Sequence, residues 1–254
     1  MKKIVIVLVF HLLAVNAFAA PIKVTLLNPG GTHWFWQMTI DFMRAAAEDL
    51  DIELEVITSD WDHFLTVEQA EKVVGREHPP EYLITGNEKS NAGKIIQIAD
   101  QAKVHTFLFS NGFVDPKDNA RFRQPRVKYT YWIGSLIPDN FSAGYQTGKA
   151  LIHRALQRGL IDEDGKVPMV AIGGTHLTHA SDERVRGLRA AIAEFEDKVV
   201  LLQVFPGDWT ALRAEEIGRG IFRRYKTVTV VWCVNDTTAF GAMDAAVSEG
   251  RKPG

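Results

Sequence analysis

Amide, carboxylate and aromatic side chains recur where the short apolar runs of this sequence end. A planar amide or carboxylate can bond two neighbouring hydroxyl groups, and an indole or phenyl face covers the C–H side of a sugar ring. The combination indicates a site for a polyhydroxylated ligand. The residues at these ends are Asn28, Trp34, Phe35, Trp36, Asn87, Glu88, Ser110, Asn111, Thr175, His176, Asp208, Trp209, Asn235 and Asp236.

Each polar member of this set also has an ordinary structural explanation. Asn, Asp and Gly are common turn and N-cap residues, so Asn87 or Ser110 alone carries little weight. The aromatic residues are stronger candidates, because an aromatic side chain in a turn is normally a core contact rather than part of a polar loop.

Other chemistries find less support in the sequence. His176 and His179 have a spacing that metal ligands can share on a helix, but no third ligand is near them, so we expect no metal site. Gly173, Gly174 and Thr175 follow an apolar run, yet neither phosphate-loop nor dinucleotide fingerprint is present. Without a nucleophile elbow or another catalytic set, we expect a binding protein with no cofactor and no enzymatic activity.

The first nineteen residues differ in pattern from the rest of the 254-residue chain. Lys2 and Lys3 precede an apolar run over residues 4–15, and Ala17 and Ala19 are small residues at the positions that a signal peptidase reads. This pattern predicts a secretory signal, cleaved after Ala19. An uncleaved membrane anchor is the weaker alternative, because about 20 apolar residues are needed to span a bilayer.

Charge and cysteine content narrow the possible partners. Without residues 1–19, which contain two lysines and no acidic residue, 27 basic residues face 31 acidic ones and the net charge is −4. This balance gives no indication of a nucleic-acid partner. Cys233 is the only cysteine, so no internal disulfide can form, and its apolar surroundings predict a buried small side chain rather than a nucleophile.

Apolar runs alternate with helical segments along the whole chain. In the first half, Met38, Phe42, Ala46 and Leu50 have the spacing of one helix face. The alternation predicts an α/β fold of two lobes, each a doubly wound parallel sheet flanked by helices, with ligands beyond the carboxyl ends of the strands. The predicted strands cover residues 22–28, 52–58, 82–85, 104–110, 169–174, 199–205 and 228–235.

The domain boundaries follow from the same alternation. We expect an N-terminal lobe over residues 20–130, a crossing between lobes over 131–139, and a C-terminal lobe over 140–254. Residues 113–128 are polar and lack periodicity, so we expect a surface loop there.

Three motifs occur in an order typical of one family. They are Asp139-Asn140-x-x-Ala143-Gly144, Arg184-x-x-Gly187, and Val234-Asn235-Asp236 followed by Ala239-x-Gly241-Ala242. From Ile22 to its last residue the chain resembles the periplasmic sugar-binding proteins of ABC transporters. The likeness is to their ribose-binding-like, type I branch, which shares its fold with lac-repressor-type cores.

The resemblance implies roles for individual residues. Phe35 and Trp36 would sandwich the sugar from the first lobe, and Trp209 would close on it from the second. Arg184 would bond ring and hydroxyl oxygens, although a solvated helix arginine is the simpler alternative. Asn140 and Asn235 would supply amides. The full set of candidate ligand-binding residues is Asn28, Trp34, Phe35, Trp36, Glu88, Asn111, Asn140, Arg184, Trp209, Asn235 and Asp236.

The sequence also departs from that family. Ser110 and Asn111 stand where close relatives carry an Asp-Arg pair, so we do not expect a simple ribose binder. Relatives continue beyond the last helix with another strand and two further crossings, so we expect the C-terminal lobe to be incomplete. The loop over 113–128 and the doubled tryptophans resemble a branch related to the binding protein of the autoinducer-2 signal.

The expected function is capture of a sugar-like ligand between two lobes in the periplasm, by a monomer that serves an ABC permease in the inner membrane. A receptor subunit that presents its ligand to a membrane sensor kinase is the alternative. A periplasmic enzyme that modifies carbohydrate is a remote third.

Overall fold

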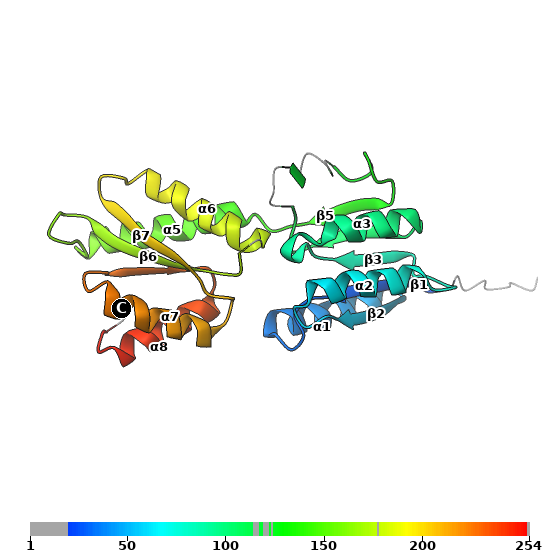
Figure 1. Cartoon of the computed structure of the whole chain (residues 1–254), viewed down its shortest axis with the longest axis horizontal. Helices are drawn as coiled ribbons and strands as arrows, with labels where there is room; N and C mark the ends of the chain where they lie inside the picture. The colour runs from blue at the N-terminus through cyan, green and yellow to red at the C-terminus, as the bar shows by residue number, and fades with distance from the viewer. Residues whose placement is uncertain (1–19, 114–116, 119–121, 123, 177, 253–254) are drawn as a thin grey trace, which may run out of the picture.

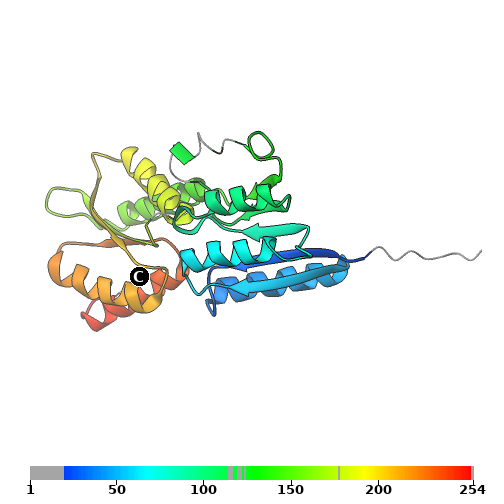
Figure 2. The same ribbon diagram turned by 45° about the vertical axis from the view of Figure 1, so that its right-hand side comes forward.

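The structure is a computed structural model that describes residues 20–113, 117–118, 122, 124–176 and 178–252. The predicted secretory signal, residues 1–19, lies outside this part, as does some of the predicted loop over 113–128. Two lobes lie side by side along the longest axis (Figure 1, Figure 2). In the part that the structure describes, no helix is both long and apolar enough to cross a membrane.

The first lobe contains a five-stranded parallel sheet with strand order β2-β1-β3-β4-β5. Strand β1 lies next to the edge strand β2 and pairs with it over its whole length, from Ile22 opposite Ile52 to Asn28 opposite Thr58. The strands are β1 (Ile22–Asn28), β2 (Ile52–Thr58), β3 (Tyr82–Thr85), β4 (His105–Phe109) and β5 (Trp132–Leu136), and the helices are α1 (Trp34–Asp49), α2 (His63–Val74), the short 3-10 helix η1 (Glu88–Ser90) and α3 (Ala92–Gln101).

The second lobe contains a three-stranded parallel sheet with strand order β7-β6-β8. Alternate residues of its central strand enter different cores, Met169 one and Val170 the other. Both faces of β6 are thus covered by helices, which explains why its sequence is continuously apolar. Its elements are α5 (Asn140–Gln157), β6 (Val167–Gly173), α6 (His179–Ala193), β7 (Val199–Pro206), α7 (Ala211–Arg224), β8 (Val230–Cys233) and α8 (Asp236–Ser248).

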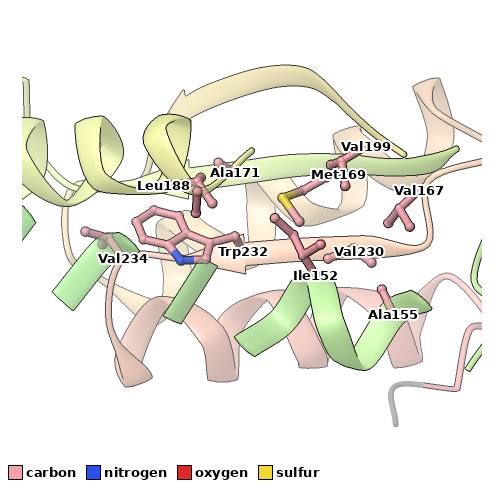
Figure 3. Close-up of a cluster of buried hydrophobic side chains, with 11 residues drawn as sticks. Ile152, Ala155, Val167, Met169, Ala171, Leu188, Val199, Val230, Trp232 and Val234 are labelled. Carbon is pink, nitrogen blue, oxygen red and sulfur yellow. The ribbon is translucent and has the colours of Figure 1, made fainter. Parts of the chain in front are cut away.

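One of these cores lies between the sheet and the paired helices α5 and α6 (Figure 3). Ile152 of α5, Leu188 of α6 and Trp232 of β8 meet there, and each is almost fully buried. The indole Nε1 of Trp232 donates to the Thr147 hydroxyl of α5 at 3.1 Å, so the polar edge of this buried ring is satisfied. The other core is closed by α7 and α8, which pack against each other.

The predicted fold class is confirmed, with two differences in detail. Trp132–Leu136 forms β5 at the edge of the first sheet, inside the stretch 131–139 that we expect to cross between the lobes. The division into lobes at 131–139 stays a prediction. The short sequence of β5, which includes Gly134, offers no alternation from which a strand could be predicted.

The second difference concerns the face that α1 buries. Met38, Phe42 and Leu50 predict the helix correctly, yet these three side chains are exposed, Phe42 to 71%. The buried face instead carries Trp36, Thr39, Ile40 and Ala47. Apolar residues lie on two sides of this helix, so spacing alone could not identify the side that faces the sheet.

Candidate ligand-binding site

A cavity of about 230 Å³ lies between the two lobes, and we call it the interlobe cavity. Its walls come from segments that follow the carboxyl ends of strands in both sheets, where parallel α/β folds bind ligands. The lining residues are His33, Trp34, Phe35, Trp36, Trp61, Glu88, Ser110 and Asn111 of the first lobe, and Thr178, Ala180, Arg184, Trp209, Asn235 and Asp236 of the second.

Nine of the eleven residues predicted from the sequence line this cavity. The two that do not are Asn28 and Asn140, and both are buried. The Asn28 amide donates to the Thr58 hydroxyl at 3.2 Å and accepts from the Gly30 N–H at 3.4 Å. Asn28 therefore fixes the turn after β1, whereas Asn140 accepts a hydrogen bond from Arg184, a residue of the cavity wall.

Aromatic rings of the first lobe form one wall of the interlobe cavity. Phe35 lies edge-on between Trp34 and Trp36, with ring centroids 6.3 and 5.2 Å away. Trp36 is buried and lies directly over Gly30, where an added Cβ would come within 1.7 Å of the indole. The absence of a side chain at Gly30 is what allows this ring to pack there.

Trp209 of the second lobe also packs over a glycine, Gly174. This tryptophan follows β7 with a positive φ of 64°, and a Cβ at Gly174 would lie 2.3 Å from its ring. The Arg184 guanidinium carbon lies 5.9 Å from the centroid of the Trp209 ring, within the range of a cation–π contact. Trp209 and Arg184 are thus held against each other at the cavity wall.

The Arg184 guanidinium is oriented by two hydrogen bonds in addition to this ring. Its Nε donates to the Asn140 Oδ1 at 3.0 Å, and its Nη1 donates to the Val234 carbonyl at 3.0 Å. Burial lowers the pKa of Arg184 below its usual value, and the nearby Asp236 opposes that shift. An arginine stays protonated under such conditions, so the cavity presents one fixed cation.

Glu88 brings a carboxyl group to the opposite side of the cavity. It begins η1, just after β3, and its Oε1 accepts a hydrogen bond from the Asn111 Nδ2 at 2.5 Å. Burial raises the pKa of Glu88 to about 7, while the Asn111 bond and the charge of Lys89 act in the opposite direction. The cavity therefore contains a carboxyl group that titrates near neutral pH.

Five lining residues were not among the predicted site residues. Ligands of parallel sheets bind beyond the carboxyl ends of the strands, and we call this the strand-end rule. Trp61 follows β2, so the same rule points to it. Ser110 follows β4 and is one of the strand-end residues that the sequence indicates, outside the eleven candidate ligand-binding residues. The sequence does not identify His33, Thr178 and Ala180 as site residues. They lie at the starts of α1 and α6, and the exact first residues of these helices cannot be predicted from the sequence.

The remaining strand-end residues have structural roles or lie away from the cavity. The Asn87 side chain donates to the Gly112 carbonyl at 2.8 Å and accepts from the Ala92 N–H at 2.9 Å, as expected of a turn and cap residue. Thr175, His176 and Asp208 do not line the interlobe cavity. No group of three His, Cys, Asp or Glu residues that could hold a metal occurs within the described residues.

Cys233 was predicted to be a buried small side chain, and the structure places it as half-buried. Burial raises the pKa of Cys233 to about 12, so the nucleophilic thiolate is scarce at neutral pH.

Residues 24–254 match the model of a protein family described as periplasmic binding protein domain. No curated protein matches the chain. A periplasmic sugar-binding protein from Pseudomonas fluorescens is 33% identical to this chain with a TM-score of 0.78, and the alignment covers 91% of this chain and 66% of that structure. The chain thus spans just under two thirds of that protein.

Two more distant structures share the fold. One is an ABC transporter solute-binding protein from Actinobacillus succinogenes with bound D-allose, at 19% identity, TM-score 0.74, and coverage of 90% of this chain and 74% of that one. The other is the fructose-binding periplasmic domain of a hybrid two-component system, at 21% identity, TM-score 0.72, and coverage of 91% and 69%. The likeness to the autoinducer-2 branch and the incomplete C-terminal lobe stay predictions.

Proposed function

The chain belongs to the family of periplasmic binding protein domains, and on that premise we propose that it captures a sugar between its two lobes and releases it unchanged. The observation that carries this proposal is the interlobe cavity, which places aromatic rings of both lobes around a fixed guanidinium and several amide and carboxyl groups. Such a set covers the apolar faces of a sugar ring and bonds its hydroxyl groups.

We assign contacts by chemistry and position. Phe35, Trp36 and Trp209 cover the ligand, and Arg184 donates to its oxygens. The other proposed contacts are Trp34, Glu88, Asn111, Asn235 and Asp236.

Asn28 and Asn140 act behind this wall rather than on the ligand. Asn28 holds the turn after β1, and Asn140 holds the Arg184 guanidinium. Both are positioning residues in this proposal.

The proposed mechanism is closure around the ligand. A ligand that contacts both lobes favours the closed arrangement only through contacts that the open arrangement lacks. Cavity residues come from both sheets, so a ligand bound there bridges the lobes. The closed shape is what a membrane partner would then recognise.

An ABC permease is the partner we favour, with the protein acting as a monomer in the periplasm. The 33% identical structure is described as a periplasmic sugar-binding protein, and the more distant structure with D-allose as an ABC transporter component. A sensor kinase is the second candidate partner, because another structure of this fold is the fructose-binding domain of a hybrid two-component system.

Equilibrium dialysis tests the proposal. The purified protein is dialysed against single labelled pentoses, hexoses and polyols, and the bound fraction is then recovered and identified by chromatography. We expect one binder with a Kd of about 1 μM or lower, which corresponds to about −8 kcal/mol, and the recovered sugar unchanged. Recovery of a modified sugar would support an enzyme instead, and the absence of any binder would overturn the proposal.

A further inference from the structure

The N-terminus of α6 lacks the cap that most helices of its lobe possess. The side chains of Asp139, Thr210 and Asn235 each cap the helix that follows them, α5, α7 and α8. Thr178, at the corresponding position of α6, makes no side-chain cap bond. The first backbone N–H groups of a helix have no partner inside it, so α6 needs an acceptor from elsewhere.

That acceptor comes from the other lobe. The Oδ1 of Asn111, in the loop after β4 of the first lobe, accepts a hydrogen bond from the Ala180 N–H of α6 at 3.1 Å. The amino-terminal end of α6 reaches the boundary between the lobes, as Figure 1 shows. Asn111 thus caps in one lobe a helix that belongs to the other, and this cap is broken when the lobes separate.

The Asn111 backbone is held rigidly enough for this role. Its carbonyl accepts from the Asn87 N–H at 3.1 Å, and its N–H donates to the Phe109 carbonyl at 2.8 Å. The Asn87 amide donates to the next carbonyl, that of Gly112, at 2.8 Å. The loops after β3 and β4 are therefore tied together beneath the side chain.

The Glu88 carboxylate determines which way the Asn111 amide points. Above the pKa of Glu88 its carboxylate is ionised and can only accept, so the NH₂ group of the amide must then face Glu88 and the oxygen must face Ala180. A reversed amide would place an oxygen against the carboxylate and a donor against the Ala180 N–H, and both contacts would be repulsive.

We propose that Glu88 and Asn111 form a latch between the lobes, in which Glu88 orients the Asn111 amide and Asn111 caps α6, so that the closed arrangement is favoured before any ligand binds. This inference rests on the proposed function. In a sugar-binding protein that partly closes without ligand, less of the free energy of sugar binding is used to close the lobes. The latch itself is a property of the ligand-free protein.

The experiment measures the lobe arrangement without any sugar. Spin labels are placed on exposed helix positions of the two lobes, at Glu71→Cys in α2 and Gln157→Cys in α5, in a Cys233→Ala background. Double electron–electron resonance at pH 8, where Glu88 is ionised, then gives the ratio of closed to open molecules. We expect Asn111→Ala to lower this ratio about fivefold, the factor that the loss of a typical N-cap corresponds to.

Thr210→Ala is the matched control, because it removes the side-chain cap of α7 within the second lobe. It should leave the ratio unchanged. Glu88→Ala should lower the ratio less than Asn111→Ala does. The double variant should match Asn111→Ala alone, because Glu88 acts through Asn111.

An unchanged ratio in Asn111→Ala, or additive effects in the double variant, would overturn the latch. A second measurement needs no variant. Hydrogen exchange at the Ala180 amide of the ligand-free protein should be slower than in an unstructured peptide. Exchange at the rate of an unstructured peptide would also overturn the latch. Because no sugar is present, these results are independent of the dialysis test. A latch that fails leaves sugar capture standing, and a protein that binds no sugar can still show the latch.

Discussion

Replacing Glu88 by glutamine should change how the stability of the first lobe depends on pH. Burial raises the pKa of Glu88 from 4.5 to about 7. Between these values the folded protein binds a proton that the unfolded chain releases, so the free energy of unfolding must fall as the pH rises through this window. Each unit of pKa shift corresponds to 1.36 kcal/mol, so the full cost above pH 7 is about 3 kcal/mol.

The assay is urea unfolding at several pH values between 4.5 and 8, followed by tryptophan fluorescence. Any other group that titrates in this range is shared by both proteins, so the difference between wild type and Glu88→Gln isolates Glu88. We expect the wild type to lose about 3 kcal/mol relative to the glutamine variant between pH 4.5 and 8. A constant difference across the window, or a wild type that gains stability with pH, would refute the reasoning.

Three further predictions concern the cavity wall. Trp36→Ala and Trp209→Ala should each weaken sugar binding by about 1 to 3 kcal/mol in titration calorimetry, and unchanged affinity in both would remove these rings from the site. Asn140→Ala should weaken binding about tenfold although it touches no ligand, because the Arg184 Nε loses the acceptor that orients it. The double variant Asn140→Ala, Arg184→Lys should bind the sugar only slightly more weakly than Asn140→Ala does. Fully additive losses of affinity would argue against a positioning role for Asn140. Gly174→Ala should displace the Trp209 ring, since the new Cβ would lie 2.3 Å from it, and an unperturbed Trp209 indole signal in a ¹H–¹⁵N NMR spectrum would contradict this packing.

The sequence was sufficient for the fold because its signals are local. Buried parallel strands such as β6 read as continuous apolar runs, and the strand-end rule then brought Trp209 and Asn235 into one site. Arg184 follows no strand directly, so it was found only through the resemblance. Trp61 lies in the loop after β2, a strand whose alternating sequence indicates a sheet edge rather than a site.

Other features could not be predicted, because they depend on how distant segments meet. Asn28 and Asn140 have the composition of ligand-binding residues, but their partners, Thr58 and Arg184, show that they support the wall. The cap that Asn111 provides to α6 joins residues 69 positions apart in the sequence and in different lobes. No local pattern records such a contact.

Isothermal titration of the sugar identified by dialysis into wild type and Arg184→Gln tests the central claim most directly. Arg184 is the one cation among the residues that line the interlobe cavity, and its guanidinium is held by both Asn140 and Val234. We expect one sugar per chain in the wild type, and binding weakened by at least about 2 kcal/mol in the variant, because a hydrogen bond to a charged group is lost. Equal affinity in the two proteins would show that the sugar does not bind between the lobes.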